Sequence, residues 1–504
     1  MTGLLILAAV GQLSQFVTRL GAGISRHFSV SQLSDGGYVC SGNTVVMGYR
    51  FVICRFDQNG NLSWYYNIRR SPSASEDPGG QSFARTSDGG FVVTGQVAYM
   101  NTNDLGLAKF TSTGTLSWMI SLSLSNSSDF GYSVIETSDN GLVITGYTDT
   151  DILLTKFNSS GTHLWTKTIG GSGTEGGRSV IETSDGGLAL VGYTNSWGAG
   201  NYDIILCKLN SAGDLQWTRT LGGPEDDLGY CVVQSADGGF VISGYTENFG
   251  AVGGDNILAK FDGSGNYLWS VVFGYGTTLD TLSSVAEGAG SILGVVSWNT
   301  PDVFTLHIPF ARFDANGNFI SAWNPMVNAV GPSETRYCYP GIAKTSDGGF
   351  VTVGRDLLIK YDASGSTCMG SAVTPNLIYP SPTITTLTLS ATSTTPSVSP
   401  LSYSRENPSP GQTWPCNPLG EEESSSGQSV ALISEHGVLR VNLPQGSYVR
   451  LSLYESTGRL AVNLYEGFMS QGEHIFTPEL ESGEIYLAVL VYGGRIATTK
   501  IASP

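Results

Sequence analysis

The sequence predicts an all-β chain built from repeats of several short strands. A Ser-Asp-Gly-Gly motif, or a close variant, recurs along the first part of the chain, and most copies are followed by a strand that carries Leu-Trp. Glycine accounts for 66 of the 504 residues and charged residues for only 13%, a composition that suits short strands and turns better than helices. Repeats of roughly 50 residues with several strands each are typical of propellers and repeat arrays.

Seven copies of the motif divide the chain up to about residue 366. They begin at Asp35, Asp88, Asp139, Asp185, Asp237, Glu287 and Asp347, and the copy at Glu287 is a decayed one. Each motif reverses the chain between two strands, because Asx and glycine residues tolerate the left-handed backbone of a tight hairpin. Four antiparallel strands per copy therefore predict a seven-bladed β-propeller over residues 16–366. A β-solenoid is the alternative, although its coils are usually shorter.

The two ends of the repeat array predict how the ring closes. The seventh copy stops near Gly365 without its Leu-Trp strand, whereas residues 13–21 match residues 215–222, which carry such a strand. We therefore expect the N-terminal strand to complete the last blade and leave no open blade edge. A decayed eighth copy is the alternative.

Residues 1–15 precede this closing strand. Residues 1–11 are apolar and resemble the hydrophobic region of a secretory signal peptide without its basic start. We expect a signal peptide that is cleaved between residues 11 and 15, with a buried strand as the alternative. No other stretch of the sequence is long and apolar enough to span a bilayer.

The chain is acidic, with a net charge of −17. This charge argues against nucleic acid and against anionic membranes as partners, and it suits cations or simple solubility. The five histidines lack metal-ligand spacing, and the sequence predicts no metal site and no cofactor. Calcium is the one ion to consider, at Asp226 with Asp227 or at Asp149 with Asp151, although an EF-hand spacing is missing.

The seven cysteines show no metal-binding pattern. Cys40 and Cys207 align with core positions of other repeats, so we expect both to be buried. Cys368 and Cys416 bracket a Ser/Thr/Pro-rich segment, and we expect them to form a disulfide in an oxidising compartment. Cys54, Cys231 and Cys338 have no assigned role.

Strand order places two kinds of loop on opposite faces of the predicted propeller. The Asp-Gly-Gly turns are short and uniform, whereas the loops on the other face vary, and variable loops on a rigid scaffold are where function usually lies. Aromatic rings there can stack on a sugar while carboxylates bind its hydroxyls. The alternative is that each aromatic side chain covers its own blade. The candidate ligand-binding residues are Trp197, Tyr202, Phe249, Trp298, Glu225, Asp226 and Asp227.

Two patterns suggest enzymes without naming a catalytic residue. The turn at residues 183–187 partly resembles the Asp-box of sialidases, and the Leu-Trp strands resemble the tryptophan-bearing repeats of quinoprotein dehydrogenases. A catalytic set would be confined to one or two blades, and no such set stands out. The tryptophans also suit ordinary blade packing.

Two further segments follow the repeats. Residues 367–428 are rich in Ser, Thr and Pro, which predicts an extended, semi-stiff linker with room for a strand or two. Residues 429–504 contain short strands with alternating apolar residues, such as 438–443, and predict a small immunoglobulin-like β-sandwich.

The last segment resembles the C-terminal sorting domain of proteins exported by the bacterial type IX secretion system. Leu-Tyr-Glu-x-x-Gly-Arg, Gly-x-His, Leu-x-x-Gly-x-Ile-Tyr and a final lysine occur in the order of that family. The matching positions include Gly458, Arg459, Gly483, Tyr486 and Lys500. Glu455, where aspartate is common, and the tail 502–504 depart from the pattern. The repeats likewise resemble the Ser-Asp-Gly-Gly-Phe-Val repeats of secreted bacterial proteins with such tails.

The resemblance implies export across the outer membrane, removal of the tail, and release or attachment at the cell surface. Its implied partner is the type IX secretion machinery. Together with the residues, it favours a secreted or outer-membrane-surface monomer that acts as a non-enzymatic binding or adhesion scaffold for a glycan or protein. The alternatives are an extracellular enzyme, either a glycan-active hydrolase or lyase or a quinone-dependent dehydrogenase, and a C-terminal module without a sorting role.

Overall fold

The computed structural model describes most of the repeat region and parts of the remaining chain. The described residues are 16–19, 24–44, 50–69, 79–99, 102–124, 128–249, 254–274, 280–288, 291–298, 305–307, 310–324, 326–328, 341–354, 357–362, short strands between 371 and 415, 431–435, 438–443, 447–454, 460–478, 485–492 and 495–502. They fall into two compact units, Met1–Pro415 and Cys416–Pro504. Over these ranges every regular element is a β-strand. Within them, no helix has the length and apolar character needed to cross a membrane.

The first unit consists of repeated antiparallel sheets in which four strands pair in chain order. In the sheet of the third repeat, β10 (Asp129–Glu136), β11 (Leu142–Thr148), β12 (Asp151–Phe157) and β13 (His163–Ile169) pair successively. The prediction of an all-β chain with repeated four-stranded sheets is therefore confirmed.

The other sheets of this unit follow the same plan. Their strands are β2 (Ile24–Gln32), β3 (Tyr38–Thr44), β4 (Arg50–Phe56) and β5 (Leu62–Arg69); β6 (Gly79–Arg85), β7 (Phe91–Tyr99), β8 (Thr102–Phe110) and β9 (Leu116–Ser123); β14 (Glu175–Glu182), β15 (Leu188–Thr194), β16 (Asp203–Leu209) and β17 (Leu215–Gly222); β18 (Asp227–Gln234), β19 (Phe240–Thr246), β20 (Asp255–Phe261) and β21 (Tyr267–Gly274); β22 (Asp280–Gly288), β23 (Ser291–Trp298), β25 (Phe310–Asp314) and β26 (Phe319–Asn324), with β24 (Thr305–His307) and β27 (Met326–Asn328) beside β23; and β28 (Gly341–Lys344), β29 (Phe350–Gly354) and β30 (Leu357–Tyr361).

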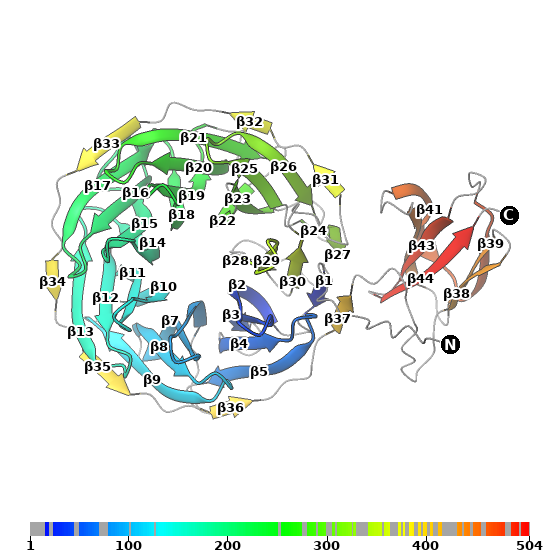
Figure 1. The fold of residues 1–504 in the computed structure, drawn as a ribbon, viewed down its shortest axis with the longest axis horizontal. Helices are drawn as coiled ribbons and strands as arrows, with labels where there is room; N and C mark the ends of the chain where they lie inside the picture. The colour runs from blue at the N-terminus through cyan, green and yellow to red at the C-terminus, as the bar shows by residue number, and fades with distance from the viewer. Residues whose placement is uncertain are drawn as a thin grey trace, which may run out of the picture. The chain divides into compact units, whose positions relative to one another are not determined.

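The sheets of the first unit form a ring, as Figure 1 shows. The first strand of each sheet lies innermost and contacts the first strand of the next sheet, and β28 contacts β2. The sheet of β28–β30 is completed by β1 (Phe16–Arg19), which pairs with β30. This is the position that β13 holds in its own sheet, so the N-terminal strand takes the fourth place.

The Ser/Thr/Pro-rich segment adds a fifth strand to each sheet of the ring. Its strands are β31 (Ser371–Val373), β32 (Asn376–Ile378), β33 (Thr383–Leu387), β34 (Thr392–Thr394), β35 (Ser397–Pro400), β36 (Ser404–Glu406) and β37 (Gln412–Pro415), which pair with β26, β21, β17, β13, β9, β5 and β1 in turn. The segment therefore runs around the outside of the ring, against the order of the repeats (Figure 1). The sequence predicts this segment as an extended linker with room for a strand or two. In the structure it instead forms an outer belt, which covers strand edges that would otherwise stay open to pairing.

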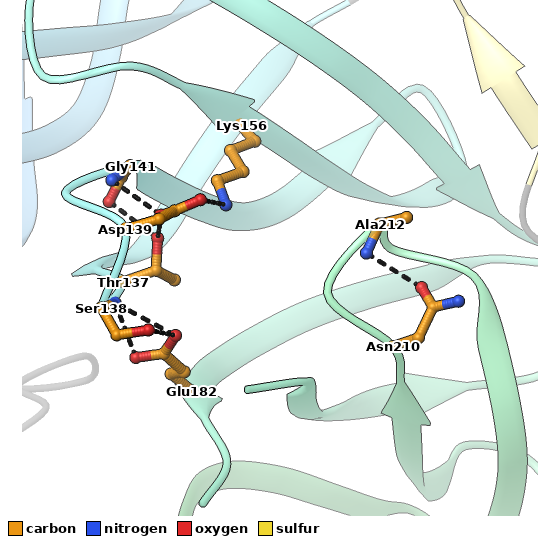
Figure 2. Close-up of polar contacts among 8 residues, drawn as sticks. All are labelled: Thr137, Ser138, Asp139, Gly141, Lys156, Glu182, Asn210 and Ala212. Atoms are coloured by element: carbon orange, nitrogen blue, oxygen red, sulfur yellow. Dashed lines mark hydrogen bonds and ion pairs between the residues drawn. The ribbon is translucent and has the colours of Figure 1, made fainter. Parts of the chain in front are cut away.

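Within the described residues, six of the seven sheets are fastened by an aspartate at the first turn and a lysine or arginine from the third strand. In the sheet of β10–β13, Asp139 Oδ1 accepts hydrogen bonds from Thr137 Oγ1 (2.6 Å) and Gly141 N (3.0 Å), while Lys156 Nζ donates to Asp139 Oδ2 (2.7 Å) (Figure 2). The Lys156 side chain is only 9% exposed, whereas that of Asp139 is 62% exposed. The aspartate thus shapes the turn with one oxygen and neutralises a buried ammonium with the other.

This Asp–cation pair recurs around the ring. The equivalent pairs are Asp35–Arg55, Asp88–Lys109, Asp185–Lys208, Asp237–Lys260 and Asp347–Lys360. A simpler turn joins the third and fourth strands, where Ala212 N donates to Asn210 Oδ1 at 3.0 Å (Figure 2).

The same turns also join neighbouring sheets. Ser138 N donates to both carboxylate oxygens of Glu182, at 3.0 and 2.8 Å, and Glu182 is the last residue of the first strand in the next sheet. Ser346 N donates in the same way to Gln32 Oε1 at 2.6 Å. Because Ser346 belongs to the last repeat and Gln32 to the first, this bond joins the last sheet of the ring to the first sheet.

The tryptophans of the fourth strands pack across the junctions between sheets. Gly213 has a φ of 79°, and a Cβ there would lie 2.9 Å from a ring carbon of Trp165 in the preceding sheet. Trp118, Trp217 and Trp269 face Gly161, Gly265 and Gly317 in the same way. These turns need glycine for its backbone conformation and for the space that the indole occupies.

The second unit contains two antiparallel sheets that share one core. One sheet holds β38 (Ala431–Glu435), β39 (Val438–Leu443) and β42 (Gly472–Phe476), and the other holds β40 (Ser447–Tyr454), β41 (Leu460–Met469), β43 (Ile485–Tyr492) and β44 (Arg495–Ala502). Leu439 and Val441 from the first sheet pack in one cluster with Leu451, Leu490 and Ile501 from the second.

We predict that Asp139→Asn destabilises the protein more than Lys156→Met. The asparagine side chain would still shape the turn but would leave a buried ammonium without its carboxylate, which costs about 2 kcal/mol. Lys156→Met leaves only an exposed carboxylate, for a loss of about 1 kcal/mol or less. Denaturant unfolding of both variants measures the difference. A larger loss in Lys156→Met would contradict this account of the pair.

Acid should weaken the same pair. The Lys156 ammonium and the Thr137 hydroxyl lower the pKa of Asp139 from 3.8 to about 2. A lowered pKa adds stability that is complete above the ordinary value and is lost as the pH falls toward the lowered one. The difference in unfolding free energy between the wild type and Asp139→Asn should therefore shrink between about pH 4 and pH 2. A difference that stays constant over this range would be evidence against the pair.

Candidate functional site

A cluster of five aromatic side chains and one arginine lies at the variable end of the third and fourth sheets. We call Phe130, Tyr132, Tyr147, Arg178, Tyr193 and Tyr202 the aromatic–arginine cluster. The Arg178 guanidinium lies 4.1 Å from the centre of the Tyr132 ring and 5.2 Å from that of Tyr193. All six side chains are partly exposed. Such an arrangement offers flat apolar surface, hydroxyl groups and a cation in one place.

The rings of the cluster are held against one another. Phe130 and Tyr147 are directly opposite on β10 and β11, and their rings stack at 5.3 Å with an interplanar angle of 11°. The Tyr202 ring meets that of Tyr193 edge-on at 5.4 Å. Burial raises the pKa of Tyr147 to about 12, with Tyr132 and Tyr193 adding to the rise. The Tyr147 phenol therefore stays a neutral hydrogen-bonding group at physiological pH.

β-Bulges place two members of the cluster. The register of β10 with β11 shifts between Gly131 and Ser133, so Tyr132 is the extra residue. The matching shift between Gly177 and Ser179 makes Arg178 the extra residue of β14. A bulge re-aims a side chain and is common next to functional sites. The repeat thus presents a different residue at the same bulge in successive sheets.

The ligand-binding residues predicted from the sequence overlap with this cluster only in part. Tyr202 belongs to it, and Tyr202 N donates to Asp226 Oδ1 at 3.4 Å. Glu225 N donates to Asn248 Oδ1 at 2.9 Å, which joins the acidic link to the loop that carries Phe249. Trp197 and Phe249 are half-buried, and each packs against a hydrophobic cluster that combines residues of two neighbouring sheets.

Asp227 differs from its neighbour Asp226. Its side chain is buried, and its Oδ2 accepts hydrogen bonds from Gly223 N (2.8 Å) and Asn248 Nδ2 (2.7 Å). Burial raises the pKa of Asp227 to about 7, and the charge of nearby Asp203 adds to the rise. The two adjacent carboxylates therefore have different environments. Asp227 is buried between sheets, whereas Asp226 accepts a hydrogen bond from Tyr202 N.

Several residues predicted from the sequence are described only in part or lie outside the described residues. Only the backbone of Trp298 is described, in β23, where it pairs with Asp280 and His307. Tyr486 is 8% exposed in the core of the second unit, and Lys500 pairs with Leu487 through the backbone. Gly458, Arg459, Gly483, Cys368, Cys416 and Cys338 lie outside the described residues.

The other cysteines occupy sheet interiors. Cys40 and Cys207 are buried, as the alignment of the repeats predicts, and Cys54 is buried directly opposite Cys40 on the adjacent strand. None of the four described cysteines, Cys231 included, forms a disulfide within the described residues. Within the described part of the chain, no three His, Cys, Asp or Glu side chains gather as a metal site.

One cavity lies on the opposite, uniform face. It has a volume of about 320 Å³ and is lined by Asp88, Lys109, Glu136 and neighbouring turn residues. These groups already bond one another, because Lys109 pairs with Asp88 and Glu136 accepts from Ser87 N at 2.6 Å. We therefore assign this cavity to the junction between sheets and not to ligand binding.

Most members of the aromatic–arginine cluster are not among the residues predicted from the sequence. The predicted residues were chosen from loops, whereas Phe130, Tyr132, Tyr147, Arg178 and Tyr193 belong to strands. The available signal was the position between glycine and serine in Gly-Tyr-Ser and Gly-Arg-Ser, which changes between repeats while its neighbours stay the same.

Comparisons with known proteins give only distant likenesses. Neither a scan against protein-family models nor a search of curated proteins found a match. Similar solved structures include a protein from Lactobacillus plantarum (14% identity, 69% of this chain and 99% of that chain, TM-score 0.40) and Drosophila Plexin A in complex with Semaphorin 1b (10% identity, 68% and 88%, TM-score 0.38). Another is PorZ, a bacterial surface component of the type IX secretion system of Porphyromonas gingivalis (12% identity, 97% and 100%, TM-score 0.15). At these TM-scores, none of them carries an argument about function.

Proposed function

We propose that the chain is a secreted or cell-surface protein whose propeller binds a glycan or protein ligand without catalysing a reaction on it. Each sheet of the ring acts as one blade, which makes a seven-bladed propeller, and the second unit acts as an immunoglobulin-like sorting domain. The protein leaves the cell through a type IX secretion system as a monomer. The C-terminal sequence motif supports the export route, and the aromatic–arginine cluster supports the binding role.

The arrangement around Arg178 is the observation that carries the binding role. The apolar face of a sugar ring stacks on an aromatic ring, and the guanidinium and phenol groups bond to its hydroxyls. Half-buried rings that already pack together lose little conformational freedom when a ligand binds. Aromatic and arginine side chains are also the residues that most often dominate protein interfaces. A glycan is therefore the first ligand class to test.

We predict that a glycan raises the melting temperature of the full chain. A panel of cell-wall and algal glycans is screened by thermal shift, because a ligand at about one hundred times its dissociation constant adds roughly 2.7 kcal/mol of stability. Tyr132→Ala and Arg178→Met should each weaken binding of the active glycan about tenfold or more, as expected for central contacts.

Arg219→Met is the matched control for this test. Arg219 also lies over an aromatic ring, that of Trp217 at 5.2 Å, but on a fourth strand away from the cluster. It should leave glycan affinity unchanged. Equal losses in Arg219→Met and Arg178→Met would refute the assignment of the cluster. A shift with a quinone cofactor and with no glycan would favour the dehydrogenase alternative instead.

We predict that residues 429–504 direct export. A fluorescent protein with a signal peptide and this segment should reach the cell surface or medium in a bacterium with a type IX system. Arg459→Ala, within the Gly-Arg motif, should hold it in the periplasm, whereas Arg450→Ala, outside the motif, should not. Periplasmic retention of the unmutated fusion would refute the sorting role.

A further inference from the structure

Two buried carboxylates meet at the junction between the fourth and fifth sheets. Asp203 opens β16 and is 1% exposed, and Asp227 opens β18 and is 0% exposed. Both lie beside Gly222, where any side chain would collide with Asp203 Oδ1 and would place its Cβ 2.7 Å from Asp227 Oδ2. Only a glycine therefore fits next to the pair.

Each of these carboxylates has one oxygen without a hydrogen-bond donor. Asp203 Oδ2 accepts from Ala199 N (3.0 Å) and Gly200 N (3.3 Å), and Asp227 Oδ2 accepts from Gly223 N and Asn248 Nδ2. Asp203 Oδ1 and Asp227 Oδ1 are both buried and have no hydrogen-bond partner. Burying a charged oxygen without a partner is costly, so the chain alone leaves this pair incomplete.

The preceding junction shows that the repeat can satisfy such a carboxylate internally. Glu175 holds the position of Asp227, and its two oxygens accept from Thr194 Oγ1 (2.8 Å), Ser196 N (3.2 Å) and Gly171 N (2.9 Å). Both oxygens of this longer side chain therefore have a donor. Asp129, at the same position of the third sheet, also has a buried Oδ1 without a hydrogen-bond partner, so an aspartate at this position leaves one oxygen unpartnered whereas the longer glutamate does not.

We propose that Asp203 and Asp227 bind one calcium ion between the fourth and fifth sheets. Carboxylate oxygens are the ligands that calcium prefers, and it accepts irregular shells of about six to eight oxygens, which water and main-chain carbonyls extend beyond these two side chains. A divalent cation also removes the repulsion between two carboxylates in a site with little water. The net charge of −17 favours cations in general.

The proposed ion would act on the candidate binding face as well as on the ring. It joins two sheets through the first residues of β16 and β18. Tyr202 immediately precedes Asp203, and its carbonyl accepts from Asp227 N at 2.6 Å. The site does not depend on the ligand-binding role, because it rests on the two carboxylates alone.

Calorimetric titration of the full chain with calcium, after removal of metals by a chelator, tests the proposal. The wild type should bind calcium with a saturable heat and melt at a higher temperature when calcium is present. Asp203→Asn and Asp227→Asn, which keep the shape of the side chains, should each bind one ion fewer per chain. Glu175→Gln is the matched control at the satisfied junction and should bind as many ions as the wild type.

Two results would overturn the proposal. One is a wild type that binds no calcium at millimolar concentration. If its unfolding free energy then also rises from pH 8 to pH 6, the two carboxylates share a proton instead. The other is a number of bound ions that stays the same in Asp203→Asn and Asp227→Asn, provided that circular dichroism shows both variants to be folded.

Discussion

The aspartate–cation pair at the first turn of six of the seven sheets is the interaction on which the ring depends. One carboxylate closes the hairpin between the first two strands and also holds a cation from the third, so a single side chain fixes three strands. The lysine needs this partner because most of its side chain is removed from water, as Lys156 is beside Asp139. The serine of the same turn bonds to the next sheet, as Ser138 does to Glu182. A short turn therefore holds the strands of its own sheet together and also bonds to the neighbouring sheet.

At the face of the ring that carries these turns, the polar side chains already bond to one another. The side chains at the opposite face are available to bind a ligand. At the turn end, aspartates, lysines and glutamates bond to one another in sheet after sheet, which leaves few polar groups for a ligand. At the opposite end, the bulges carry Tyr132 in one sheet and Arg178 in the next. Variation at a fixed backbone position is tolerated there because those side chains hold no strand in place. The difference between the two faces therefore follows from packing constraints. It agrees with the sequence pattern, in which the turns of one face are uniform and the loops of the other face vary.

Features with a signal that repeats within one repeat could be predicted from the sequence. Features whose interacting residues lie far apart in the chain could not. The Asp-Gly-Gly turns, the buried Cys40 and the repeated sheets follow from patterns within one repeat. The lysine partner of Asp139 lies 17 residues away on a strand and resembles any other strand lysine. The outer belt was missed because Ser, Thr and Pro composition predicts a solvated spacer, although a stretch such as Thr383–Leu387 also suits a strand edge. The pairing of Asp203 with Asp227 depends on adjacent sheets, which one repeat does not encode.

The outer belt makes closure of the ring a late event in folding. β1 is a strand of four residues that lies between β30 and β37, so its partners come from residues 357–361 and 412–415. The bond from Ser346 to Gln32 also spans 314 residues. Contacts this far apart in sequence carry a large loop-closure cost before they form. The N-terminal strand therefore has no partner until β30 is present, and its outer edge stays open until the belt has passed every other sheet.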